Sequence, residues 1–184
     1  MKIIVLKFGG TSVGSIKRIK IVAKIIAKYK RKYRVIVLSS AMSGVTNNLI
    51  NLSKEISKNF SDSEYDVLVS SGEQISCALI SGELINNGFN SRSWMSWQIP
   101  ITTSGKHKFS RINKINKSQI INYLNKGGIP IITGFQGINN KNRITTIGRG
   151  GTDASAIMFA KFFNAEKCII YTDVEGVYST DPNK

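Results

Sequence analysis

The chain has 184 residues and a mass of 20.3 kDa, and its 26 Lys plus Arg against 11 Asp plus Glu give a formal net charge of 26 − 11 = +15. A chain of this length buries about 70% of its unfolded surface, so it can form a core without disulfides or metals. No apolar run approaches the roughly 18 residues that a membrane-spanning helix needs, and the N-terminus lacks the features of a secretory signal. We therefore expect a cytoplasmic protein without membrane association.

The positive charge is uneven, since residues 1–34 hold 11 basic and no acidic side chains. Basic stretches of this kind are typical of nucleic-acid-binding proteins, in which Lys and Arg neutralise phosphates. However, Lys, Asn and Ile are all abundant, as in proteins from A/T-rich genomes, and the chain has no Arg-Gly-Phe/Tyr motif. We keep a basic nucleic-acid-binding module as an alternative and do not predict it as the main function.

Continuous apolar runs alternate along the chain with segments of helical period. The runs predict strands at residues 2–7, 35–39, 91–95, 129–133 and 168–172, and the periodic segments predict helices at 15–32, 47–58, 64–87, 117–126 and 150–163. Buried strands separated by helices are typical of a parallel sheet with helices on both faces. We predict a single α/β domain, a three-layer αβα sandwich around a mainly parallel sheet, truncated at its C-terminus. In such sheets ligands bind beyond the carboxyl ends of the strands.

The first strand leads directly into a glycine-rich segment, Lys7-Phe8-Gly9-Gly10-Thr11-Ser12-Val13-Gly14. Glycine lets backbone N–H groups approach a phosphate closely, and the helix that follows adds the positive end of its dipole. Lys7 can reach the same anion, so the segment predicts a phosphate-binding loop. It is not a Walker loop, because the lysine precedes the glycines. The alternative is a tight strand-to-helix turn with an incidental lysine.

A second glycine-rich segment, residues 145–156, leads into the last predicted helix. Here Arg149 lies among glycines, and Thr152 and Asp153 follow at the start of the helix. A guanidinium fork, backbone donors and a carboxylate within a few residues predict an anion-binding site. The alternative is that Thr152 or Asp153 only caps the helix.

Other segments leave their roles open. Ser70-Ser71-Gly72 is predicted to form a turn that places Glu73 at the head of an apolar helix, where Glu73 either binds a substrate ammonium group or only favours the helix N-terminus. Residues 171–178 either line a nucleotide pocket or form a surface turn. His107, the single histidine, is assigned no chemistry. Cys77 and Cys168 lack metal-binding spacing, and we expect both to be buried thiols.

Five motifs occur in the order found in the aspartate kinases of the amino acid kinase family: KFGGTSVG at 7–14, SGE at 71–73, FQG at 135–137, TTIGRGGTDASA at 145–156 and YTDVEGVYSTDP at 171–182. The chain resembles this family over essentially its whole length. The resemblance implies that residues 1–184 are an incomplete amino acid kinase catalytic domain, without the rest of the nucleotide-binding lobe and the regulatory ACT domains. It also implies transfer of the ATP γ-phosphoryl group to the side-chain carboxylate of L-aspartate, which gives 4-phospho-L-aspartate for lysine, threonine and methionine biosynthesis. ATP would bind with Mg²⁺, and no tightly held metal is expected.

The resemblance further implies roles for particular residues. The expected catalytic residues are Lys7, which would stabilise the transferring phosphoryl group, and Asp153, which would organise the groups around it. The expected aspartate-binding residues are Thr46, Glu73, Arg149, Gly150, Gly151 and Thr152. The expected nucleotide-binding residues are Lys7, Phe8, Gly9, Gly10, Thr172, Asp173, Tyr178 and Asn183.

Two other hypotheses stay open at this point. One is an inactive, truncated aspartate kinase remnant, and the other is the basic nucleic-acid-binding module. The small-molecule partners implied are ATP and L-aspartate. The resemblance also allows a homo-oligomer, or a partner chain that supplies the missing C-terminal lobe.

Overall fold

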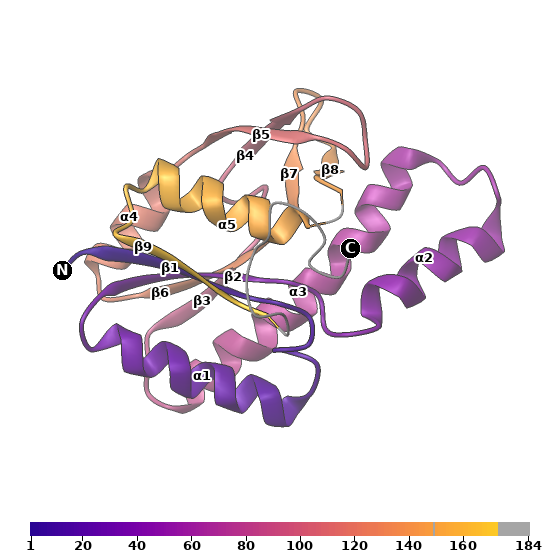
Figure 1. The fold of residues 1–184 in the computed structure, drawn as a ribbon. Coiled ribbons are helices and arrows are strands. Elements are labelled where there is room, and N and C mark those ends of the chain that lie inside the picture. Colours follow the sequence, from indigo (N-terminus) through magenta and orange to yellow (C-terminus); the bar gives the residue numbers. More distant parts are fainter. Residues whose placement is uncertain (149, 173–184) are drawn as a thin grey trace, which may run out of the picture.

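The computed structural model describes residues 1–148 and 150–172, in which strands and helices alternate much as the sequence predicts (Figure 1). The elements are β1 (Ile3–Phe8), α1 (Ile16–Lys30), β2 (Arg34–Ser39), α2 (Val45–Ile56), α3 (Asp62–Asn86), β3 (Ser91–Trp94), β4 (Ile101–Ser104), β5 (Arg111–Ile115), α4 (Ser118–Asn125), β6 (Ile129–Thr133), β7 (Gln136–Ile138), β8 (Ile144–Thr146), α5 (Gly151–Phe162) and β9 (Lys167–Tyr171). All five predicted strands and all five predicted helices are present, with ends shifted by at most two residues.

Within the described part of the chain, the main sheet has five strands in the order β3-β6-β2-β1-β9, and every pairing among them is parallel. Phe8, the last residue of β1, is in register with Ser39 of β2 and with Tyr171 of β9, and Ser39 is in register with Thr133 of β6. The carboxyl ends of four strands therefore lie at one edge of the sheet. The loops that leave these ends are close together in space although they are far apart in sequence.

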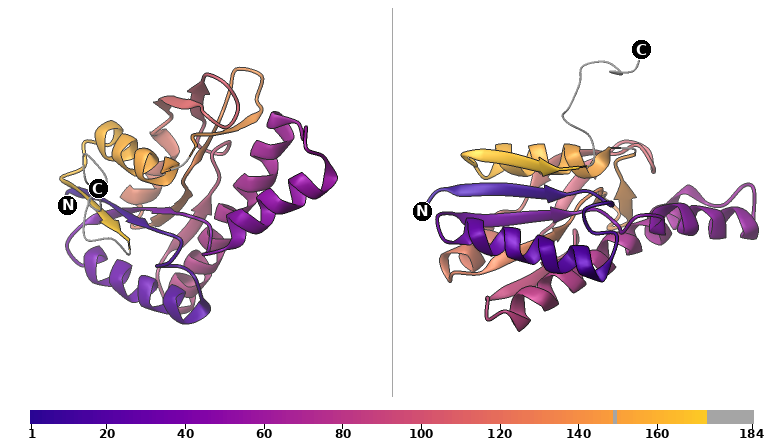
Figure 2. Two further views of the ribbon diagram at one scale, coloured as in Figure 1. Left: turned by 45° about the vertical axis from the view of Figure 1, so that its right-hand side comes forward. Right: turned by 60° about the horizontal axis from the view of Figure 1, so that its bottom comes forward.

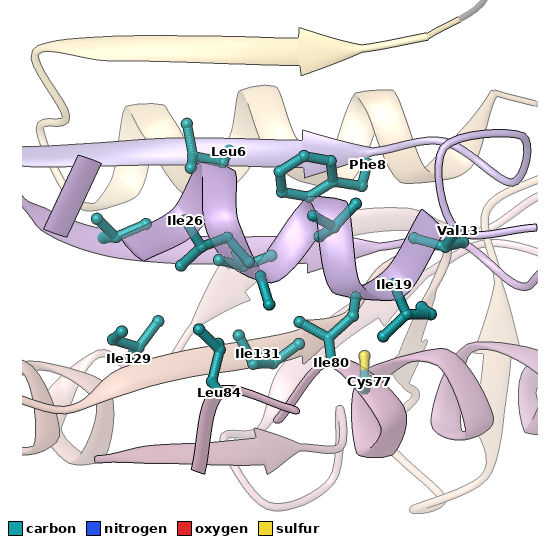
Figure 3. Packing of buried hydrophobic residues seen from close by; sticks show 14 of the residues in the cluster. Leu6, Phe8, Val13, Ile19, Ile26, Cys77, Ile80, Leu84, Ile129 and Ile131 are labelled. Carbon is teal, nitrogen blue, oxygen red and sulfur yellow. The ribbon is translucent and has the colours of Figure 1, made fainter. Parts of the chain in front are cut away.

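Helices cover both faces of this sheet, as predicted. Alternate residues of β1 point to opposite faces, because side chains along a strand alternate with a period of two. Leu6 and Phe8 pack against α1 and α3 in a cluster that includes Ile19 and Ile80 (Figure 3). Val5 faces the other way and belongs to the cluster formed with α4 and α5. The three-layer αβα arrangement is thus confirmed, with one apolar core on each side of the sheet.

Helix α1 shows how the sequence specifies one of these layers. The Ser15 hydroxyl caps the helix by accepting a hydrogen bond from the Arg18 N–H at 3.3 Å. The helix buries an apolar stripe at spacings of three and four residues, consisting of Ile19, Val22, Ala23 and Ile26. Lys28 and Lys30 lie in its last turn, where their positive charge interacts favourably with the negative end of the helix dipole.

A second, four-stranded sheet was not predicted. Its strand order is β5-β4-β7-β8, and both antiparallel and parallel pairs occur in it. Figure 1 shows these strands at the top of the molecule, beyond α5. They are only three to five residues long, and Thr and other polar residues interrupt their apolar positions, so they lack the continuous apolar pattern that identified the main sheet.

The predicted small-residue turn at residues 70–72 is wrong, because α3 runs without interruption through this stretch. The Ser70 and Ser71 hydroxyls donate to the carbonyl groups of Val67 and Leu68 at 2.8 and 2.7 Å, so both serines are satisfied within the helix. The two views of Figure 2 show that α2 and the first half of α3 extend together beyond the end of the main sheet.

The prediction for the cysteines is half right. Cys77 is fully buried in α3, whereas Cys168 is exposed. The reason is that β9 is the outermost strand of the main sheet within the described part of the chain. Among residues 1–148 and 150–172, the structure contains no helix with the length and apolar character needed to span a bilayer.

Candidate active site

A cavity of about 950 Å³ lies at the edge of the main sheet where the strands have their carboxyl ends. Its walls come from the loops after β1 and β2, from α2 and α3, and from the amino end of α5. The lining residues that carry the chemistry discussed below are Lys7, Gly10, Thr46, Tyr65, Glu73, Lys108, Phe109, Thr146, Gly150, Gly151, Thr152 and Asp153. The cavity has the size of a typical small-molecule site.

Lys7 and Asp153 form an ion pair in this cavity. Lys7 is the second-last residue of β1 and points to the face covered by α5, where its Nζ lies 2.6 Å from the Asp153 Oδ1. The lysine side chain is 7% exposed and that of the aspartate is 40% exposed. Asp153 therefore fixes a nearly buried ammonium group at the cavity wall and remains accessible itself. The alternative of an incidental lysine does not explain this arrangement.

The glycine-rich loop after β1 approaches the loop after β2 very closely. A Cβ on Gly10 would lie 3.0 Å from the Ala41 carbonyl oxygen, and the Gly10 carbonyl accepts a hydrogen bond from the Ser43 N–H at 3.1 Å. Within the described ranges, the N–H groups of Gly10, Thr11 and Ser12 have no acceptor. These free donors suit an anion, as the glycines predict.

Phe8 and Gly9 connect the start of the glycine-rich loop to β9. Phe8 is completely buried and its ring stacks on Tyr171, with the ring centroids 4.8 Å apart. The Gly9 N–H donates to the Tyr171 carbonyl at 2.9 Å, so this amide is already occupied. Neither residue lines the cavity, and their predicted contact with the nucleotide gains no support from this geometry.

Glu73 is a buried carboxyl group in the middle of α3. The Ala41 N–H donates to its Oε1 at 3.1 Å, while its Oε2 is buried and has no hydrogen-bond partner within the described residues. Burial raises the pKa of Glu73 from its ordinary value of 4.5 to about 8, and the hydrogen bond from Ala41 only partly opposes this effect. The alternative that Glu73 favours a helix N-terminus is wrong, because α3 begins 11 residues earlier.

The amino end of α5 forms another wall of the cavity. Gly150 precedes the helix with a φ of +72°, a conformation that strongly favours glycine. A Cβ on Gly151 would lie 2.8 Å from the Phe135 ring, so the helix start packs closely on the β6–β7 loop. Since Gly150 is the capping residue and has no side chain, the alternative that Thr152 or Asp153 is the N-cap is wrong.

The structure thus brings together most of the predicted site residues that it describes. Those that line the cavity are Lys7, Gly10, Thr46, Glu73, Gly150, Gly151, Thr152 and Asp153. Thr172 follows β9 and does not line the cavity. Four further predictions, Arg149, Asp173, Tyr178 and Asn183, lie outside the described residues.

Sequence reasoning missed a second buried acid on the same helix. Asp66 is fully buried in α3 and accepts a hydrogen bond from the Thr146 hydroxyl at 2.6 Å, and Thr146 lines the cavity. A signal was present, since Asp66 and Glu73 are seven residues apart and therefore lie on one face of a helix. His107, which was assigned no chemistry, contacts the same carboxylate.

An α/β fold with an anion-binding loop, a fixed lysine and a buried carboxylate at the carboxyl edge of a parallel sheet defines a class of proteins that bind phosphorylated ligands. The sequence pattern described as the amino acid kinase family matches residues 2–184. The chain belongs to the amino acid kinase family.

Individual relatives agree with the resemblance to aspartate kinases. An aspartokinase from Geobacillus stearothermophilus is 48% identical over 183 residues, which are 99% of this chain and 45% of that protein. An aspartokinase from Rickettsia felis is 45% identical over 186 residues, covering 99% of this chain and 46% of that protein. The chain therefore spans about half the length of the curated relatives that it matches.

Solved structures give the same result. The crystal structure of E. coli aspartokinase III in complex with aspartate and ADP superposes with a TM-score of 0.87 at 27% identity, over 99% of this chain and 52% of that one. The crystal structure of aspartate kinase from Synechocystis has a TM-score of 0.80 at 38% identity, over 98% of this chain and 30% of that one. The predicted fold and the predicted family are confirmed.

Proposed function

We propose that this chain carries the acceptor site and the phosphate-binding loop of an aspartate kinase. The observation that carries the proposal is the pairing of a nearly buried Lys7 with Asp153 in the same cavity as a carboxylate oxygen of Glu73 that has no partner among residues 1–148 and 150–172. A phosphoryl group and an amino acid need these two kinds of group, a cation for one and an anion for the other. The aspartate and ADP in the E. coli aspartokinase III structure support the same assignment.

In the proposed reaction an oxygen of the aspartate side-chain carboxylate attacks the γ-phosphorus of ATP. The bond between the γ-phosphorus and the bridging oxygen breaks, ADP leaves, and 4-phospho-L-aspartate forms. Both the attacking group and the leaving group are anions, so no proton has to be transferred. The task of the protein is to position the reactants and to neutralise charge.

Lys7 would neutralise negative charge on the transferring group. Its ammonium is held by Asp153 in one position, so little reorganisation is needed as charge develops during the reaction. The Gly10 N–H, which has no acceptor within the described residues, would add a neutral donor in the same cavity. In this proposal Phe8 and Gly9 support the phosphate-binding loop and do not contact the phosphate themselves.

Glu73 would bind the aspartate ammonium group through Oε2. Without a ligand this carboxyl group is largely protonated at neutral pH, because its pKa is raised by burial to about 8. A bound ammonium would supply the missing countercharge and release the proton. The walls formed by Thr46, Gly150, Gly151 and Thr152 would enclose the rest of the amino acid.

Mg²⁺ would enter with ATP. Within residues 1–148 and 150–172 there is no group of three or more His, Cys, Asp or Glu side chains that could hold a metal ion. Mg²⁺ commonly binds through the phosphates of a substrate with few protein ligands, which fits this set of residues. When bound, it would neutralise phosphate charge.

We further propose that Arg149, Asp173, Tyr178 and Asn183 complete the aspartate and nucleotide sites, as their motif positions imply. Residues 1–184 would then form part of an amino acid kinase catalytic domain. The relatives are about twice as long, so the remaining half of their length, or a partner chain, would supply the rest of the nucleotide site and any regulatory domains. An inactive remnant is the competing hypothesis, and activity of the 184-residue chain would overturn it.

The test uses the purified chain with Mg-ATP and L-aspartate, and traps the acyl phosphate with hydroxylamine. We expect aspartate-dependent hydroxamate that falls at least about 100-fold in Lys7→Ala, because transition-state charge loses its partner. Lys2→Ala is the matched control, since Lys2 lies on the surface and pairs with Glu166. A folded wild-type chain that gives no hydroxamate would contradict activity of this chain by itself, and would mean that it needs the missing part or a partner chain, or that it has lost its activity.

A further inference from the structure

The turn between β4 and β5 is held against α3 by a buried carboxylate. Asp66 has no exposed surface, and polar groups from two places in the chain, residues 107–108 and Thr146, converge on it. The Thr146 hydroxyl donates to Oδ1 at 2.6 Å, the His107 Nδ1 lies 2.6 Å from Oδ2, and the Lys108 N–H donates to both oxygens at 3.2 Å. The carboxylate joins α3, β8 and the turn.

His107 reaches this carboxylate from the turn itself. The imidazole Nδ1 and the Asp66 Oδ2 share a hydrogen bond. The imidazole is 24% exposed and Asp66 is buried, so the contact lies at the boundary between solvent and the interior. The pair thus connects an outer part of the turn to a fixed point on α3.

The turn forms part of the cavity wall. Lys108 and Phe109 both line the cavity, together with Tyr65 of α3. The Lys108 Nζ lies 2.5 Å from the Asp62 Oδ1 and 4.4 Å from the centre of the Tyr65 ring. Both the backbone and the side chain of Lys108 are therefore attached to α3.

The backbone at Lys108 is strained. Its φ is +67°, which is uncommon for a residue with a long side chain. Such conformations persist only where neighbouring contacts hold them, and they concentrate at functional sites. Here the two oxygens of Asp66 hold the Lys108 N–H, and the Lys108 carbonyl lies against Gly148, where a Cβ would be only 3.1 Å away.

We propose that Asp66 and His107 are positioning residues that fix residues 105–109 as a wall on the acceptor side of the cavity. Asp66 lies two helical turns, about 10 Å, from Glu73 on the same face of α3. The clamp and the carboxylate that would bind the aspartate ammonium are thus parts of one rigid helix. The inference rests on the proposed function for the identity of the ligand, while the clamp itself does not depend on it.

The first measurement is amide hydrogen exchange of residues 104–110 in the full 184-residue chain. Asp66→Leu keeps the approximate size of the side chain and removes the acceptor, and His107→Phe keeps a ring and removes the donor. We expect exchange at Lys108 to be at least about tenfold faster in either variant, since a lost hydrogen bond changes opening by about this factor. Asp62→Asn is the matched control, because it removes an exposed contact of the same lysine and should leave exchange within about threefold of the wild type.

The second measurement is calorimetric binding of L-aspartate and, separately, of ADP. We expect the dissociation constant for L-aspartate to rise at least about tenfold in His107→Phe while that for ADP stays unchanged, because the wall is attached to α3, the helix that carries Glu73, and the contacts that hold it do not involve the phosphate loop. Neither measurement requires turnover, so a chain that makes no acyl phosphate still tests the clamp. Unchanged exchange in His107→Phe would overturn the clamp, and faster exchange with unchanged aspartate binding would overturn its role at the acceptor site.

Discussion

Replacing Glu73 by Gln is expected to stabilise the chain without ligand, and to do so increasingly as the pH rises. The Glu73 carboxyl group is 3% exposed, and burial raises its pKa from 4.5 to about 8. Between these two values the folded state holds a proton that the unfolded state has released. The carboxyl group therefore costs nothing below pH 4.5 and makes folding progressively less favourable as the pH rises to about 8.

The size of the effect follows from the width of this interval. Each pH unit corresponds to about 1.4 kcal/mol, so at pH 7 the cost is about 3 kcal/mol. Glutamine is neutral at every pH and has nearly the same shape, and its Oε1 can still accept from the Ala41 N–H. We expect Glu73→Gln to raise the melting temperature by roughly 6–12 °C at pH 7 and by almost nothing at pH 4.5.

The assay is thermal unfolding by circular dichroism at pH 4.5, 6, 7 and 8. Glu55→Gln, on the exposed surface of α2, is the matched control and should follow the wild type at each pH. A constant difference between Glu73→Gln and the wild type over this range would refute the reasoning, because it would mean that Glu73 does not retain a proton in the fold. The same substitution should remove L-aspartate binding, so that stability is gained as function is lost.

Three further outcomes are expected. Gly72→Ala should destabilise the chain by about 1–3 kcal/mol in urea unfolding, because a Cβ would lie 2.8 Å from the Ala41 Cβ. Gly82→Ala on the same helix has nothing within 4 Å and should stabilise by about 0.5–1 kcal/mol, and equal effects of the two would refute the packing argument. In the native chain a thiol reagent should modify Cys168 and leave Cys77 unmodified, because Cys77 is fully buried and burial raises the pKa of its thiol strongly. Mass spectrometry of the labelled peptides measures this, and labelling of Cys77 in the native chain would contradict the prediction.

The affinity for L-aspartate should rise with pH between 6 and 8. The reason is that the aspartate ammonium binds the ionised form of Glu73. Because burial raises the pKa of Glu73 to about 8, its carboxyl group must first lose a proton in this pH range. We expect the dissociation constant to fall by up to about tenfold per pH unit, and calorimetry at three pH values measures it. A flat profile would argue that Glu73 is not the ammonium site.

The main sheet and its helices could be predicted because their signals are local. Strands such as β2 are continuous apolar runs, and α1 has a capping serine and an apolar stripe that identify it from sequence alone. The second sheet could not be predicted in this way. Its strands are short and carry many polar residues. They form because the Thr103 hydroxyl meets that of Thr145 and because β4 pairs with β7 through Thr102 and Ile138, which are 36 residues apart.

The candidate site shows the same contrast between features with local sequence signals and features that depend on packing. Lys7, Gly10 and Asp153 were identified from sequence because glycine-rich turns next to strands and helices have a specific chemistry for anions. Glu73 was identified but was placed in the wrong local structure, since a run of Ser and Gly is typical of a turn in isolation. In the structure that run lies inside a helix, where Gly72 allows α3 to approach Ala41.

The sequence by itself therefore determined the family, the layered α/β architecture and the loops that carry the anion chemistry. Only the tertiary structure decided that Lys7 pairs with Asp153 146 residues away, that Glu73 is buried, and that Asp66 holds His107. Burial and pairing over such separations depend on how the helices pack on the sheet. Residue types and local spacing do not contain that information, because the pKa of a carboxyl group keeps its ordinary value in water and rises when the group is buried.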